Sequence, residues 1–184
     1  ISIFDGIDSS TNYFKGFNTW TSTGTQFSMQ IDIAQWGEPK YYDNGLKFQN
    51  CNNISITATD TPDLSQETSL VQAFRTKYGG GGASGYNTRF SGGSAMGNWD
   101  VSTITNIQTM FRGITSANFN QDLNSWNTSN ITNMSSYTFG QYPSHINNQS
   151  SPGINNWDTS SVTNMSTMFF GHNSWTGLDL SNWD

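Results

Sequence analysis

The sequence has few charged residues and few of the cysteines and histidines that form disulfides, bind metals or act in catalysis. Of 184 residues, 11% are charged, two are His, and Cys51 is the single cysteine. One cysteine excludes a disulfide within the chain and a cysteine-based zinc site. The seven Lys and Arg are too few and too scattered to hold nucleic acid or anionic lipid by charge. We therefore expect no nucleic-acid partner.

The chain also lacks long hydrophobic runs. It has no apolar stretch of the length that crosses a bilayer, so we expect no membrane insertion within this segment. Hydrophobic residues make up 33%, yet aromatic residues reach 14%. Disordered chains are poor in aromatic residues and rich in charge, so this composition indicates an ordered chain with a narrow core. A polar surface with little charge favours an extracellular, cell-surface or virion-surface location.

An internal repeat is the strongest signal in the sequence. Segments that begin at Trp99, Trp126 and Trp157 align without gaps and share a Ser and a Thr-Asn pair at fixed positions. Weaker copies extend the pattern toward the N-terminus, and unit starts fall at residues 36, 62, 99, 126, 157 and 183. The base period is about 26 residues, and longer units carry insertions. Because residue 183 opens a new unit, we interpret the chain as a fragment of a longer protein.

Each unit contains a pattern that is typical of a short helix. Ser102 stands where an N-cap belongs, and Ile104, Ile107 and Phe111 then recur on one helical face. Gly113 follows as a left-handed stop. Before the next Trp, residues 122–125 are expected to form a short extended segment with Leu123 inward. The expected unit is a strand, a turn, a helix of two to three turns and a return loop.

No unit of this size can bury its apolar side alone, but stacked units share a continuous core. We expect the Trp residues to stack in a column through successive coils. Asn106, Asn133 and Asn164 are expected to form a second column that bonds backbone groups between coils.

The motif from Trp157 to Phe169, with the segment Asn120 to Trp126, resembles the BspA-like leucine-rich-repeat surface proteins. The resemblance covers residues 31–184 and is closest from 97 onward. It implies an α/β repeat solenoid of the leucine-rich-repeat type, right-handed, with one short parallel strand and one short helix per coil. It also implies a role in adhesion or partner binding and no catalytic residues. Pro62 in place of Trp, and Tyr137-Thr138-Phe139 in place of Met-Phe, depart from the pattern.

Residues 1–30 do not fit the repeat. Residues 1–4 and 27–30 alternate like strands, with glycines between them. We interpret residues 1–30 as an N-terminal β cap or the end of a preceding β domain, and residues 31–184 as the repeat array.

Sequence patterns of enzymes are missing. His145 and His172 have no acid or nucleophile at a diagnostic spacing, and Gly79–Gly82 is not followed by the Lys-Ser/Thr of a phosphate-binding loop. Calcium-binding strings are also missing. We expect a non-enzymatic protein with no cofactor and no metal site.

Two insertions remain as candidate binding loops, one around Tyr86 and one around Tyr142. Insertions in repeat arrays map to surface loops, and Tyr among Gly, Ser and Asn is a composition typical of binding loops. The alternatives are a tolerated insertion or a contact with a neighbouring subunit. The candidate partner-binding residues are Tyr78, Tyr86, Asn87, Arg89, Tyr142, His145 and Trp175.

The sequence thus predicts a surface-exposed scaffold for adhesion or for recognition of a host-surface glycan or protein. The alternative is a structural subunit of a fibre, filament or virion decoration, whose contacts are with neighbouring subunits of the same assembly. An accessory domain of a larger enzyme is a more distant alternative.

Overall fold

The computed structural model describes residues 7–8, 13–14, 30–37, 40–42, 45–49, 53–75, 89–91, 94–114, 121–140, 149–150, 152–171 and 175–184. The strands are β1 (Ile7–Asp8), β2 (Tyr13–Phe14), β3 (Gln30–Ile33), β4 (Lys40–Tyr42), β5 (Asn53–Ile56), β6 (Asp63–Gln66), β7 (Arg89–Ser91), β8 (Gln149–Ser150) and β9 (Trp175–Thr176). A 3-10 helix, η2 (Ser94–Asn98), precedes Trp99.

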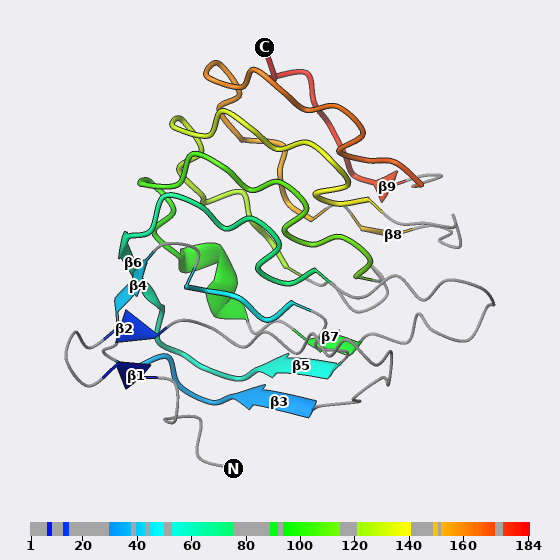
Figure 1. Cartoon of the computed structure of the whole chain (residues 1–184). Coiled ribbons are helices and arrows are strands. Elements are labelled where there is room, and N and C mark those ends of the chain that lie inside the picture. Colours follow the sequence, from blue (N-terminus) through cyan, green and yellow to red (C-terminus); the bar gives the residue numbers. More distant parts are fainter. Residues whose placement is uncertain are drawn as a thin grey trace, which may run out of the picture.

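The strands form three small sheets along a stack of coils (Figure 1). One sheet has the order β1-β2-β4-β6, a second has the order β3-β5-β7, and β8 pairs with β9. Only the β1-β2 pair is antiparallel, and the other pairs are parallel. Each parallel pair joins segments from successive turns of the chain, so the sheets run along the stack rather than within one coil.

From residue 69 onward, isolated bridges join successive coils in addition to the strand pairs β5-β7 and β8-β9. Isolated parallel bridges join Ser69 to Asn106, Asn106 to Asn133, and Asn133 to Asn164. In Figure 1 these coils lie one above another, from the green segment to the red C-terminus. The same position of the repeat therefore lies on the same side of the stack in four successive coils.

The expectation of one strand and one helix per coil is wrong. The described residues contain no α-helix, and residues 101–114 form successive turns. Within these turns N–H groups bond to the carbonyl three residues earlier, as from Ile104 to Val101 and from Met110 to Ile107. The α/β leucine-rich-repeat architecture expected from the resemblance is thereby overturned.

Two features explain why no helix forms. Other N–H groups in the same segment bond to the next coil, as from Ile107 to the carbonyl oxygen of Asn133 at 2.9 Å. A helix would instead satisfy them within its own segment. In addition, Thr109 has a φ of 56°, and the equivalent residues Gln72, Ser136 and Thr167 are also left-handed. A left-handed residue at this position of each unit ends any helical run.

Ser102 does not act as an N-cap. Its own N–H donates to Oδ1 of Asp100 at 3.0 Å, which closes a turn around the Asp side chain. Gly113 and Gly171 do have positive φ, at 80° and 86°, as expected for the left-handed stop. They end a turn rather than a helix.

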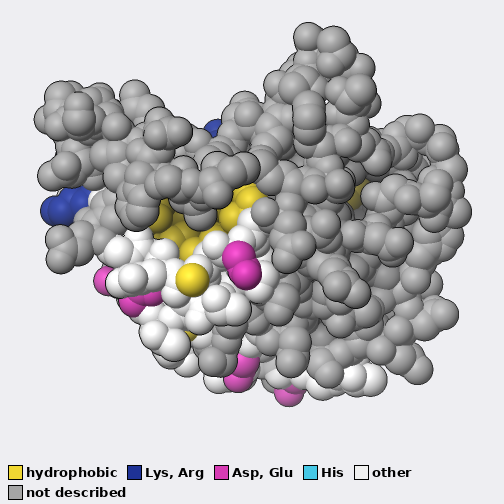
Figure 2. All heavy atoms as spheres, turned by 90° about the horizontal axis from the view of Figure 1, so that it is seen from below, with side chains coloured by type: hydrophobic (Ala, Val, Ile, Leu, Met, Phe, Trp, Pro, Cys, Tyr) yellow, Lys and Arg dark blue, Asp and Glu magenta, His cyan; other side chains and the backbone are white. Residues whose placement is uncertain are grey.

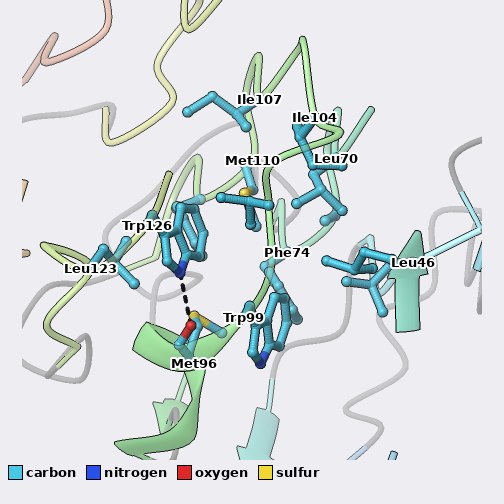
Figure 3. Packing of buried hydrophobic residues seen from close by; sticks show 14 of the residues in the cluster. Leu46, Leu70, Phe74, Met96, Trp99, Ile104, Ile107, Met110, Leu123 and Trp126 are labelled. Carbon is cyan, nitrogen blue, oxygen red and sulfur yellow. Dashed lines mark hydrogen bonds between the residues drawn. The ribbon is translucent and has the colours of Figure 1, made fainter. Parts of the chain in front are cut away.

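Two aromatic columns form the core. The Trp column is confirmed: the rings of Trp99, Trp126, Trp157 and Trp183 stack in sequence, with centroids 6.5, 5.9 and 6.3 Å apart. A second column consists of Phe48, Phe74, Phe111, Phe139 and Phe169, whose neighbouring rings also stack. Figure 3 shows Trp126 and Trp99 among the buried apolar side chains, with a hydrogen bond from Trp126 to the carbonyl oxygen of Met96.

The indole N–H groups tie one coil to the one before it. Trp126 Nε1 donates to Met96 O at 2.8 Å, and Trp157 Nε1 donates to Leu123 O at 2.9 Å. Leu123 is fully buried, as expected, but residues 122–125 form a turn and not a strand. This turn directs the carbonyl oxygen of Leu123 toward the indole N–H of Trp157.

The Asn column exists, but its predicted role is wrong. Asn106, Asn133 and Asn164 occupy the bridge positions, and the Oδ1 atom of each accepts from the N–H two residues later in its own coil. At this place in the coil, the side chain that bonds to the neighbouring coil is that of the Thr before each Asn. Thr132 Oγ1 donates to the carbonyl of Thr105 at 3.2 Å, and Thr105 and Thr163 repeat the bond.

On the face that Figure 2 shows, much of the described surface is polar. In Figure 2, which views the molecule from below Figure 1, hydrophobic side chains gather between polar and undescribed atoms, and acidic side chains are scattered over the polar part. Of the large hydrophobic residues that are described, Met165 and Phe170 in the last coil are exposed, at 38% and 45%.

Candidate functional site

Most residues predicted to bind a partner lie outside the described part of the chain. These residues are Tyr78, Tyr86, Asn87, Tyr142 and His145. The backbones of two others are placed. Arg89 is the first residue of β7 and pairs with Asn53, while Trp175 is the first residue of β9 and pairs with Gln149. They belong to different sheets, so they are not brought together by pairing.

A different set of side chains follows the stacked Phe column. The residue immediately after each Phe is Arg75, Arg112, Gly140 and Phe170 in four successive coils. The coils are in register here because Phe74 N donates to the carbonyl of Met110 at 2.9 Å and the neighbouring Phe rings stack. A Phe that points into the core places the next side chain toward the outside of the stack.

Arg75 and Arg112 carry like charges at neighbouring positions of this outer column. The pKa of Arg75 is lowered first by partial burial of its guanidinium and then by the charge of Arg112. Arg75 nevertheless stays protonated at neutral pH because the ordinary pKa of arginine is so high. The Nε atom of Arg75 is buried and has no hydrogen-bond partner among the described residues.

Gly140 has no side chain, and Tyr137 occupies the position that a side chain of residue 140 would take in this column. A Cβ atom on Gly140 would lie 2.7 Å from both Cα and Cβ of Tyr137, so only glycine leaves room for this side chain. The guanidinium of Arg112 lies 4.5 Å from the centre of the Tyr137 ring, a cation–π contact. On its other side Tyr137 meets Phe170 edge to face, with ring centres 5.2 Å apart.

The local backbone explains how Tyr137 reaches this place. Ser136 and Tyr137 both have positive φ, at 60° and 66°. Phe139 follows Trp126 by one residue more than Phe111 follows Trp99. The extra residue is Tyr137, because Thr138 takes the place of Met110: the carbonyl oxygen of each accepts from the Phe N–H of the coil before it. Thr138 is buried, and its hydroxyl donates to the carbonyl oxygens of Ile107 and Ser135.

We call the row formed by Arg75, Arg112, Tyr137 and Phe170 the Arg–aromatic edge. It crosses four coils and combines two cationic side chains with two rings, of which Phe170 is 45% exposed. Arginine forks pair well with carboxylate and sulfate-like groups, and aromatic rings pack against apolar faces. The two predicted loops begin next to this row in the sequence, since one follows Arg75 and the other follows Gly140.

Sequence reasoning missed the Arg–aromatic edge, although the signals were present. The alignment of Phe74-Arg75 with Phe111-Arg112 places two arginines in one column. The departure at Tyr137-Thr138-Phe139 marks the coil where that column changes. No sequence pattern shows that Tyr137 lies in the space next to Gly140 where a Cβ atom would otherwise be.

Several acidic side chains accept hydrogen bonds within turns. Oδ1 of Asp63, Asp100 and Asp158 each accepts from the N–H two residues later, and Asn127 makes the same turn in its coil. Hydrogen bonds from the side chain and then the backbone of Ser102 hold the pKa of Asp100 below its usual value, and Ser160 does the same for Asp158. These carboxylates therefore act as turn acceptors.

No group of three or more His, Cys, Asp and Glu side chains among the described residues is placed to hold a metal ion. No helix in this part of the chain is long and apolar enough to cross a membrane.

The stacked coils and their repeated columns define a protein built from tandem coil repeats. A family described as "Mycoplasma protein of unknown function, DUF285" matches residues 44–150 and, in a second overlapping match, residues 83–184. The first match alone covers more than half of the chain, and the chain belongs to this family. Comparison with curated proteins and with solved structures gave no significant match.

Proposed function

We propose that this protein is a non-enzymatic scaffold, exposed on a cell or virion surface, that recognises a partner through the side of the stack that carries the Arg–aromatic edge. The motif that resembles BspA-like surface proteins supports a surface role, and membership of the DUF285 family is consistent with it. The single observation that carries the proposal is the grouping of two arginines and two rings on one side of the stack.

The use of the remaining side chains supports a scaffold. The Asp and Asn side chains accept turn hydrogen bonds, and the Thr hydroxyls of one column bond to the neighbouring coil. Groups engaged in this way hold the backbone in register and are not free for proton transfer or nucleophilic attack. The Arg–aromatic edge differs because Arg75 Nε has no such partner among the described residues.

The alternative function is an assembly subunit, and one observation favours it. Ile104, Ile107, Ile131 and Met134 are fully buried, whereas the equivalent residues of the last coil, Val162 and Met165, are half-buried and 38% exposed. A further coil of a longer chain would bury them in the same way, and so would a neighbouring subunit. An assembly role would then use the end of the stack rather than its side.

A binding assay with intact host cells distinguishes these functions. The whole chain is compared with a variant in which residues 78–87 are replaced by a short Gly-Ser linker, which leaves β7 (Arg89–Ser91) in place. Saturable binding that is lost in the linker variant supports recognition through the side of the stack. Absence of binding, together with concentration-dependent association that Met165→Ser abolishes, would support assembly instead and overturn the proposal.

A further inference from the structure

We propose that the folded chain accepts an N-linked sugar at Asn127. The acceptor lies in the sequon Asn127-Thr128-Ser129, and the donor is a sugar activated as a nucleotide diphosphate or a lipid diphosphate. Such a modification lies outside the recognition of a partner, and the Arg–aromatic edge takes no part in it.

Sequons of the form Asn-x-Ser/Thr recur in this chain because the repeat is rich in these residues. A sugar is bulky and is added at the surface, so the acceptor needs a free NH2 group and a hydroxyl two residues later that an enzyme can reach. The contacts of each Asn therefore decide which sequon is usable in the folded chain. Among the described residues, sequons begin at Asn53, Asn127, Asn130, Asn133 and Asn164.

Asn127 presents a free amide group. Its Oδ1 accepts from the N–H of Ser129 at 3.3 Å and from the hydroxyl of the same residue at 2.8 Å. Oδ1 and Nδ2 lie on opposite sides of a planar amide, so holding Oδ1 against the turn directs the NH2 group away from it. Asn127 is exposed, and its Nδ2 forms no hydrogen bond with the described residues.

The middle residue anchors this sequon to the stack. Thr128 is 1% exposed, and its Oγ1 donates to the carbonyl oxygen of Asp158 in the next coil at 3.0 Å. Because Thr128 points inward, Asn127 is held on the outside. The side chain of Asn127 thus stands at a fixed place on the surface with its NH2 group toward solvent.

The repeat shows that the turn itself does not require Asn. Asp63, Asp100 and Asp158 close the same turn at the equivalent position of other coils, each with Oδ1 as the acceptor. Asn127 keeps this acceptor oxygen and adds an NH2 group that the turn does not use. The coil that begins at Trp126 therefore carries a potential nucleophile where these other coils carry a carboxylate.

Folding withdraws the two neighbouring sequons. Nδ2 of Asn130 donates to the carbonyl oxygen of Ser102 in the coil before it at 2.7 Å, so its amide is already engaged. Asn133 is half-buried at a bridge between coils, and Ser135, which supplies the hydroxyl of its sequon, is 1% exposed. An enzyme can reach neither site without local opening of the stack.

The two remaining sequons also differ from that of Asn127. Asn53 lies in β5, which pairs with β3 on one side and β7 on the other. Asn164 is exposed, but among the described residues its Oδ1 accepts from the N–H of Ser166 and not from the hydroxyl. Asn127 is thus the sequon that combines exposure, a free NH2 group and a hydroxyl held beside the amide.

The transfer balances with the activated sugar as the co-reactant. Nδ2 of Asn127 attacks C1 of the sugar, the bond from Nδ2 to C1 forms, and the bond from C1 to the phosphate oxygen breaks. The diphosphate leaves with the bonding electron pair, and the amide loses one proton to solvent. The catalyst is a separate glycosyltransferase, and this chain supplies the acceptor.

The test compares the whole folded chain with a synthetic peptide of residues 125–137, which contains three sequons without the fold. Both are incubated with a soluble asparagine glycosyltransferase and UDP-glucose, and peptide mapping by mass spectrometry gives the rate at each Asn. The peptide measures the preference of the enzyme for each sequence. Relative to the peptide, we expect the folded chain to keep the rate at Asn127 within about threefold and to lose about tenfold or more at Asn130 and Asn133, because these need local opening.

Substitutions in the same turn transplant or remove the site. Asp100→Asn and Asp158→Asn each create a sequon whose third residue is Ser102 or Ser160, in the turn that Asn127 forms. We expect each substitution to add one sugar to the folded chain. Asn127→Asp is the matched control, since it keeps the turn acceptor and should abolish the sugar at residue 127 without lowering the urea midpoint.

Three results would overturn the inference. In the first, Asn127 of the folded chain loses as much rate relative to the peptide as Asn133 does. In the second, the three sequons keep equal rates in the folded chain, or neither transplanted position takes a sugar. The third concerns the protein isolated from its own cells or virions, which should carry a sugar at Asn127, and an unmodified Asn127 there would also overturn it.

Discussion

The indole Nε1 of Trp157 donates a hydrogen bond of 2.9 Å to the carbonyl oxygen of Leu123 in the coil before it. Trp126 makes the equivalent bond to Met96, and Trp183 makes it to Ile154. The Trp column thus joins the coils in two ways, through the stacked rings and through hydrogen bonds from the rings of Trp126, Trp157 and Trp183 to the neighbouring backbone.

Trp157→Phe should lower the free energy of unfolding by about 1 to 3 kcal/mol, because the smaller ring fills less of the core and the carbonyl of Leu123 loses one of its two donors, keeping only the N–H of Trp126. Urea denaturation followed by circular dichroism measures the change. Trp183→Phe is the control, since its bond to Ile154 is only partly buried and water can replace it. Equal losses in the two variants would contradict the role assigned to the buried hydrogen bond.

Gly97→Ala should be destabilising by about 1 to 3 kcal/mol, because a Cβ atom at this buried position would collide with the backbone carbonyl oxygen of Asp122. The carbonyl belongs to the next coil, so relief requires the two coils to move apart. Thermal unfolding compares this variant with Asn98→Ala, an exposed position in the same 3-10 helix, where a change within about 0.5 kcal/mol is expected. A similar effect of both would show that the close approach at Gly97 is unimportant.

Thr167→Asn should stabilise the protein by about 0.5 to 1 kcal/mol. Thr167 is exposed and has a φ of 57°, a conformation that is unfavourable for a β-branched side chain and that Asn tolerates. The control is Thr163→Asn, which removes a hydroxyl that donates to the carbonyl of Thr132 and should not stabilise. A loss of stability on Thr167→Asn, measured by urea midpoint, would contradict the strain at this position.

Stability should fall at low pH in part through the turn carboxylates. The pKa values of Asp100 and Asp158 lie below the usual 3.8 because the side chains and then the backbone N–H groups of Ser102 and Ser160 donate to them. A lowered pKa in the folded state means that this stabilisation is present above the ordinary pKa and is lost as pH falls through the folded value.

The double variant Asp100→Asn with Asp158→Asn tests this prediction. Asn127 makes the same turn in its own coil, so the substitution preserves the backbone. Urea midpoints measured between about pH 5 and pH 2 should fall less steeply for the variant than for the unchanged protein. Parallel curves would show that these two carboxylates do not contribute to the acid dependence.

The repeat spacing was sufficient to predict the Trp column, because residues at one position of stacked coils must lie above one another. It also indicated the inward position of Leu123 and the left-handed glycines Gly113 and Gly171. It was not sufficient to predict the backbone. Apolar residues three apart, such as Ile104, Ile107 and Met110, suit one face of a helix and equally suit a chain of turns.

The sequence by itself therefore determined the period, the family and the columns of the core. Only the tertiary structure decided where the backbone hydrogen bonds go, because an N–H can bond within its own segment or to the next coil and the side-chain pattern is the same in both. Tertiary structure also created the Arg–aromatic edge. Gly140 leaves room for Tyr137 within one turn, and Tyr137 meets Arg112 of the coil before and Phe170 of the coil after only once the three coils are packed together.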